Sequence, residues 1–158
     1  MSRVVYDGKV KVYYAPAIAS VADPTIAEFT TAGTDLTPYI TKDGVSVPAT
    51  QNLVDVGGID DVYNPEIVGT WGGGPLELTM FRDDADETDA YDLIVYGTKG
   101  FIVISRFGTP VAADIVEVWP VEMHEPTLMA SAKDEAQKFK AAFAITAEPL
   151  MRAVVAAA

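Results

Sequence analysis

The chain has 158 residues, which suits one domain with a full hydrophobic core, and 49% of them are hydrophobic. It contains no cysteine, so disulfides, thiolate metal sites and cysteine nucleophiles are excluded, and no apolar run approaches membrane-spanning length. The formal net charge of −12 disfavours adhesive binding of nucleic acid, which needs clusters of Lys and Arg against the phosphates.

Residues 1–14 predict an N-terminal strand, or a strand pair bent at Asp7-Gly8. Val10 and Val12 alternate with lysines, as in a strand that buries one face. A terminus of this kind is suited to pairing at the edge of a sheet. The first residues lack a charged segment followed by a long apolar stretch, so we expect no signal peptide.

Residues 15–75 indicate an arm and a long loop, because six of the chain's ten prolines lie there. The stretch is too apolar for a free linker, so we expect it to be ordered partly by its own core and partly by contacts outside the chain. Its apolar residues include Leu53, Val54, Val56, Ile59, Val62, Tyr63 and Ile67. The run 72–74 lacks the lysine of a phosphate loop, so its glycines favour a hinge at the root of the loop over a nucleotide site.

A predicted strand over 76–81 leads into a predicted short helix over about 84–96. Asp84 and Glu87 have the spacing of a capping box, and the neighbouring acids lie where the helix dipole favours negative charge. Gly97 suits the left-handed residue that follows a helix end. The acidic run is therefore interpreted as a helix cap.

Three further strands are predicted downstream of the helix. Residues 101–107 are apolar on both faces, so this strand is expected to be central, and 115–121 follow as the next strand. Residues 138–146 fit a strand or a helix, and Pro149 favours the strand. The tail 150–158 is small and apolar, and we expect it to be poorly ordered on its own.

The sequence offers no convergent set of catalytic, cofactor-binding or metal-binding residues, so an enzyme is disfavoured. Its one histidine, His124, cannot build a multi-histidine zinc site, and no serine lies in a Gly-x-Ser-x-Gly elbow. A calcium loop in the acidic run 84–88 has alternate oxygens but lacks the central glycine. Trp71 and Trp119 are expected to pack rather than to bind a sugar.

The order and spacing of the elements over 76–149 resemble the tail tube protein, or major tail protein, of long-tailed phages. These elements are the strand 76–81, the short helix and the strands at 101–104, 114–121 and 138–146. The resemblance implies a single domain over 1–158 that folds as an antiparallel β-sandwich with a flanking helix. It also implies hexameric rings that stack into a tube through which DNA leaves, an architecture shared with type VI secretion tubes.

The resemblance further implies what the chain contacts and where. The partners are copies of the same chain and other tail proteins, with no membrane contact, and the site is the virion tail, assembled in the host cytoplasm. A long loop between early strands contacts the next ring, which here assigns the inter-ring contact to Leu53, Val54, Val56, Tyr63 and Trp71. An acidic lumen repels phosphates, so DNA passes without specific binding.

Two other classes remain open from the sequence. Another virion structural protein, such as a head–tail joining or capsid-decorating protein, is also expected to be acidic and free of a catalytic site. A β-sandwich that binds a small ligand is the second class, and it is distinguished by melting that depends on the ligand.

Overall fold

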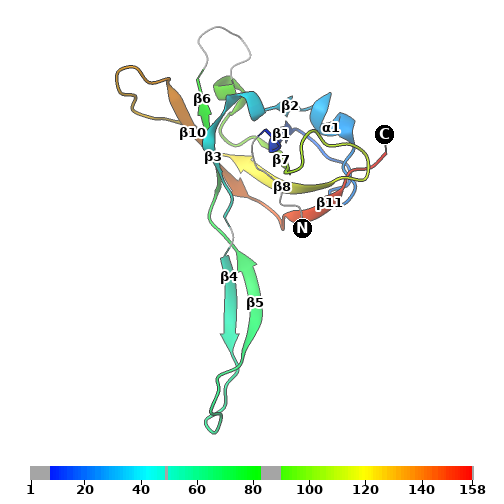
Figure 1. Cartoon of the computed structure of the whole chain (residues 1–158), viewed down its shortest axis with the longest axis vertical. Helices are drawn as coiled ribbons and strands as arrows, with labels where there is room; N and C mark the ends of the chain where they lie inside the picture. The colour runs from blue at the N-terminus through cyan, green and yellow to red at the C-terminus, as the bar shows by residue number, and fades with distance from the viewer. Residues whose placement is uncertain (1–7, 49, 83–89, 158) are drawn as a thin grey trace.

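The computed structural model describes residues 8–48, 50–82 and 90–157, which form an antiparallel β-sandwich body with one long projecting hairpin (Figure 1). The strands are β1 (Lys11–Ala15), β2 (Thr34–Asp35), β3 (Ile40–Ser46), β4 (Thr50–Asp55), β5 (Glu66–Gly72), β6 (Leu76–Phe81), β7 (Lys99–Ser105), β8 (Ile115–Met123), β9 (Thr127–Leu128), β10 (Lys138–Ile145) and β11 (Leu150–Val154). The helices are α1 (Ile26–Thr30), the 3-10 helix η1 (Thr37–Tyr39) and α2 (Ala90–Leu93). The predicted mainly β fold is confirmed.

The body is one sheet with the strand order β2-β1-β7-β8-β10-β6-β3, and β4 and β5 form a separate two-stranded sheet. β7 lies between β1 and β8, so the prediction of a central strand here is confirmed. β1 is not at the end of the sheet, because β2 pairs with its other edge. The rest of the predicted N-terminal strand, residues 1–7, lies outside the described residues.

Alternation along the central strands builds two hydrophobic clusters, one on each face of β1, β7 and β8. Ile102 and Ile104 of β7 join the larger cluster with Trp119 and Phe139, all fully buried. Val103, between them, joins the smaller cluster on the opposite face. Both faces of β7 are covered, which is why this strand reads as a continuous apolar run.

The smaller cluster is covered by α1, which contributes the fully buried Phe29 and the partly buried Ile26. The Glu28 carboxylate fixes the start of this short helix by accepting hydrogen bonds from the backbone N–H groups of Thr25 (2.8 Å) and Ala19 (2.9 Å). These two hydrogen bonds, the one from Ala19 first, hold the pKa of Glu28 below its usual value.

Residues 15–75 are more regular than the predicted arm and loop. They contain α1, η1, and β2 to β5, of which β3 joins the main sheet beside β6. Four of the six prolines lie at starts of elements: Pro24 precedes α1, Pro38 lies in the first turn of η1, and Pro65 and Pro75 precede β5 and β6. These elements were missed because the shortest, such as β2 and η1, have only two or three residues, and β4 and β5 do not alternate apolar and polar residues.

The C-terminal tail corrects the expectation of poor order over 150–158. Leu150–Val154 form β11, which pairs antiparallel with β8. Ala153 and Val155 are buried in the smaller cluster, and the Val155 N–H donates to the Asp114 carbonyl at 2.9 Å. The tail is ordered because β8 offers it a free edge, which the tail's own composition does not indicate.

The predicted strand over 138–146 is confirmed as β10, which lies between β6 and β8. The helix predicted over about 84–96 is described only in part, and its described part is helical over Ala90–Leu93 alone. Ile94, Val95 and Tyr96 are poor helix formers, so the helix ends early, and Gly97 takes a positive φ of 80° in the turn that follows. The caps Asp84 and Glu87, and the whole acidic run 84–88, lie outside the described residues.

Candidate assembly site

The most distinctive surface is the hairpin of β4 and β5, here called the arm (residues 50–72), which extends from the body along the longest axis of the molecule (Figure 1). Its strands pair with each other, and among the described residues no other strand pairs with either. Both outer edges of the arm therefore present unpaired backbone groups. An isolated two-stranded hairpin is marginally stable in water, so an arm of this kind is expected to gain order from a partner.

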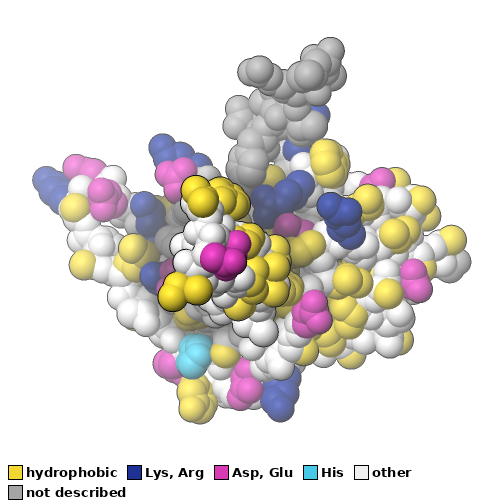
Figure 2. All heavy atoms as spheres, turned by 90° about the horizontal axis from the view of Figure 1, so that it is seen from below, with side chains coloured by type: hydrophobic (Ala, Val, Ile, Leu, Met, Phe, Trp, Pro, Cys, Tyr) yellow, Lys and Arg dark blue, Asp and Glu magenta, His cyan; other side chains and the backbone are white. Residues whose placement is uncertain are grey.

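The arm carries exposed apolar side chains. Leu53 is 59% exposed, Tyr63 81% and Trp71 41%, while Ile59 and Val62 at the tip are fully exposed. Figure 2, seen from below along the arm, shows these hydrophobic side chains clustered on the projection, with acidic ones among them. Contiguous exposed apolar surface of this kind marks an interaction site.

Both faces of the arm are apolar. Leu53 pairs with Val68 and Val54 pairs with Ile67 across the two strands. Because successive residues of a strand point to opposite faces, the first pair lies on one face and the second on the other. All four side chains are more than 40% exposed, so the arm presents an apolar pair in each direction.

The arm is also acidic. Asp55, Asp60, Asp61 and Glu66 are its only charged residues, and no Lys, Arg or His lies between Lys42 and Arg82. Two of these carboxylates shape the tip: Asp55 accepts from the Gly57 N–H at 2.8 Å and Asp61 accepts from the Gly58 N–H at 2.6 Å. The tip is therefore a hydrogen-bonded turn with negative charge and exposed apolar side chains.

At the arm's root the two chains pass close together. A Cβ on Gly73 would lie 2.9 Å from the Pro48 Cβ, so a side chain there forces the two chains apart. Gly72 and Gly74, on either side, have open space around them. The predicted hinge run 72–74 thus lies where the arm joins the body.

The five residues predicted to make the inter-ring contact, Leu53, Val54, Val56, Tyr63 and Trp71, all lie on the arm and are all exposed. Their contact with another copy stays a prediction. Sequence reasoning missed that Leu53, Val54 and Trp71 belong to paired strands, because apolar residues stand side by side in each strand and hide its alternation. It also left Ile59 and Val62 out of the contact set, although they are the most exposed apolar residues described.

Of the residues considered for chemistry, Trp71 lies on the arm, and His124 and Trp119 lie in the body. His124 is exposed just after β8, and Trp119 is fully buried, as a packing residue is expected to be. Within the described ranges no three His, Asp or Glu residues group to hold a metal ion. None of the described helices is long and apolar enough to cross a membrane.

Comparison with known proteins places these observations in a family. A family model described as phage tail tube protein matches residues 1–158. No curated protein matches the chain. One similar solved chain belongs to the cryo-EM structure of the anti-feeding prophage baseplate, 6-fold symmetrised, with a TM-score of 0.60 and 12% identity over 95% of this chain and 97% of that chain. At this identity the likeness concerns the fold.

Proposed function

Because the chain belongs to the phage tail tube protein family, and is therefore a structural protein of the virion tail rather than an enzyme, we propose that it polymerises as stacked hexameric rings into the tail tube. The tube is the conduit through which DNA leaves the particle. The observation that carries this proposal is the arm, a projecting hairpin that is apolar on both faces and has no partner strand among the described residues.

The two apolar faces of the arm support a contact between rings. An arm that lies on the outside of a neighbouring copy needs one apolar face, whereas an arm inserted between two copies needs two. We propose that each arm enters the adjacent ring and is covered from both sides. Insertion also pairs or shields the free edges of β4 and β5.

A ring of six is supported by the structurally similar chain, which comes from a baseplate solved with 6-fold symmetry. In the body, β3 pairs with β6 on one edge, and no described strand pairs with its other edge. An unpaired edge of this kind is suited to joining the sheet of a neighbouring subunit within the ring. Such head-to-tail contacts close by rotation.

The acidity of the chain supports the conduit role. Six copies at a formal charge of −12 give a ring of −72. A negative wall repels phosphates, so DNA slides without adhering. The same charge opposes assembly at low ionic strength, and salt that screens it strengthens assembly.

The test is negative-stain microscopy of the purified protein, concentrated across a salt series, with its mass in solution measured alongside. Hollow stacked rings that lengthen as salt rises are the expected result. Closed rings that never stack favour another virion role, such as head–tail joining or capsid decoration. A monomer whose melting temperature rises with a small ligand contradicts the proposal in favour of a binding module.

A further inference from the structure

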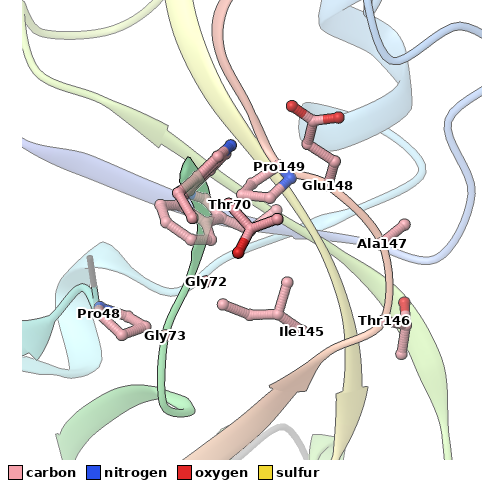
Figure 3. Close-up of a pocket in the computed structure, with 11 residues that line it drawn as sticks. Pro48, Thr70, Gly72, Gly73, Ile145, Thr146, Ala147, Glu148 and Pro149 are labelled. Carbon is pink, nitrogen blue, oxygen red and sulfur yellow. The ribbon is translucent and has the colours of Figure 1, made fainter. Parts of the chain in front are cut away.

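A cleft of about 500 Å³ opens where the arm leaves the body (Figure 3). One wall belongs to the arm and its root, with Pro48, Thr70, Trp71 and Gly73. The other wall is the turn from β10 to β11, residues 145–149, which Figure 3 shows facing Thr70 and Gly72 across the opening. Both tryptophans of the chain, Trp71 and Trp119, line this cleft.

The cleft exists because two strands share one edge of β8 and diverge there. β11 pairs with β8 up to Val118, and β10 pairs with it from Val121 onward. Between these points the only backbone link to the turn is the Thr146 N–H, which donates to the Pro120 carbonyl at 3.0 Å. Trp119 lies at this divergence, so its indole borders the gap that the diverging strands leave.

Trp119 also has an unmet hydrogen-bonding requirement. The residue is fully buried, yet its Nε1–H is the one buried side-chain polar group in the described residues without a hydrogen-bond partner. Buried N–H groups are nearly always paired, because leaving one unpaired forfeits its hydration without compensation. A cleft with a mixed lining, in which Trp71, Ile145 and Pro149 supply apolar surface beside this lone donor, fits a ligand that brings an apolar side chain and a carbonyl acceptor.

The chain itself carries a segment of that chemistry at the other end of the arm. The tip between β4 and β5 exposes Ile59 and Val62 completely, and its backbone carbonyls accompany them. The tip cannot enter its own cleft, because β4 and β5 hold it away from the root. From Thr50 to Asp60 the arm spans at most roughly 35 Å, at about 3.3 Å per residue.

We propose that the cleft at the arm root binds the arm tip of a second copy, with Trp119 Nε1–H donating to a backbone carbonyl of that tip. The proposal rests on the function proposed above and names the acceptor surface for the arm. Tip and root are different surfaces, so the contact is heterologous and repeats without closing, as a stack requires. The arm length then sets the axial repeat at no more than roughly 35 Å.

Charge adds a condition to this contact. Glu148 lines the cleft, and Asp60 and Asp61 lie between Ile59 and Val62 in the tip. Like charges on both sides weaken the contact at low ionic strength, and salt relieves their repulsion. The docking is therefore expected to tighten under the same conditions that favour stacking.

Because the chain has no cysteine, one introduced pair reports the contact directly. Val62→Cys in the tip and Thr146→Cys in the cleft wall are made as separate single variants and mixed under assembling salt and mild oxidation. Disulfide-linked dimers are expected, since a disulfide needs the two Cα atoms within about 7 Å. The control replaces the second variant by Leu128→Cys, which is exposed on β9 and does not line the cleft, and this mixture is expected to stay unlinked.

The role of the indole is tested with Trp119→Phe, which removes the N–H and keeps an apolar ring. Losing one hydrogen bond is expected to raise the concentration needed for assembly by about three- to tenfold. In the unsubstituted protein, emission of the partly exposed Trp71 is expected to shift to the blue on assembly, as the tip covers it. A shift of assembly in Trp119→Phe with an unchanged melting temperature separates docking from a structural defect.

The outcomes distinguish this proposal from the proposed function. Tubes that form without the tip-to-cleft disulfide, or that cross-link equally to the β9 control, overturn the docking and leave the tail tube role standing. Unsubstituted protein that forms no polymer at any salt overturns both. Dimers specific to the cleft, together with the weakened assembly of Trp119→Phe, establish the cleft as the acceptor.

Discussion

β5 and β6 are consecutive strands separated only by residues 73–75, yet they have opposite environments. In β6, Leu76, Leu78 and Met80 are fully buried in the larger cluster of the body. In β5, Ile67 is 54% exposed and Val68 66%. The two strands contain similar numbers of apolar residues, so composition does not distinguish core from interface here.

The order of the residues does distinguish them. β6 alternates apolar and polar residues, which suits a strand with one buried face. β4 and β5 place Leu53 beside Val54 and Ile67 beside Val68, so both faces of the ribbon are apolar. A two-stranded ribbon that is apolar on both faces is not explained by its own fold, and it indicates burial by other copies. Substitutions in the two regions should therefore affect different equilibria.

The largest effect is expected in the body. Phe139→Ala removes a fully buried side chain that packs edge-on against Tyr91, with ring centroids 5.3 Å apart. It should lower the free energy of unfolding by about 3–5 kcal/mol, measured by denaturant titration of the free subunit. The matched control is Phe107→Ala, which removes a 68% exposed ring and should change stability by less than about 0.5 kcal/mol. Equal losses in the two variants would contradict the assigned core.

In the arm, Leu53→Asp combined with Val54→Asp should act on assembly instead. It places a charge on each apolar face, and burying two leucine- or valine-sized groups contributes about 1.5–3 kcal/mol each, so assembly should weaken by more than about 100-fold. The melting temperature of the free subunit should stay unchanged. Pelleting of tubes and thermal melting measure the two quantities. Loss of cooperative melting in the monomer would show that this segment is core.

A milder pair of variants separates the two faces of the arm. Leu53→Thr with Val68→Thr changes one face, and Val54→Thr with Ile67→Thr changes the other, while threonine keeps the preference for strand. Each variant should weaken pelleting by about tenfold if both faces are covered. An effect confined to one variant would mean that the arm lies on a neighbour rather than between two.

These contrasts explain which parts of the fold the sequence predicts well. The predicted strands over 76–81, 101–107, 115–121 and 138–146 lie near their observed bounds, because their apolar patterns follow from burial in the two hydrophobic clusters of the body. The order of the tail 150–158 is not predicted, since β11 is ordered by pairing with an edge of β8, which lies far away in the chain. The alternation of apolar residues along a strand shows which of its faces is buried. It does not show which distant strand has a free edge that this strand can pair with.

The candidate site was predicted in part for the same reason. Leu53, Val54, Val56, Tyr63 and Trp71 stood out as too apolar for a loop, and the structure gathers them on the arm. The pairing of β4 with β5 was not predicted, because adjacent apolar residues in each strand hide the apolar–polar alternation that indicates a strand. The cleft at the arm root depends on Trp119 and the turn after β10, which only the folded sheet brings beside the arm.

A smaller effect is expected at α1, where it depends on pH. Glu28 has a lowered pKa in the folded state, so its hydrogen bonds stabilise the protein fully above the unfolded pKa and are lost as the pH falls through the folded pKa. Glu28→Gln should therefore cost at most about 1 kcal/mol at pH 7, since the carboxylate is exposed to solvent, and the difference from the unsubstituted protein should shrink below about pH 4. Melting curves at both pH values measure this. A difference that grows at low pH would contradict the assignment.

The smallest effect is expected at His124, and its substitution tests the prediction that this histidine has no catalytic role. The side chain is exposed after β8, and the hydrogen bond from its backbone N–H to the Ala142 carbonyl, at 3.1 Å, survives substitution. His124→Ala should change the free energy of unfolding, measured by denaturant titration, by less than about 0.5 kcal/mol and leave tube length unchanged. Assembly is the sharper measurement, because a body residue outside the arm should not alter it. Short or absent tubes from a stable variant would show that the end of β8 belongs to an interface, and would extend the assembly surface from the arm to the body.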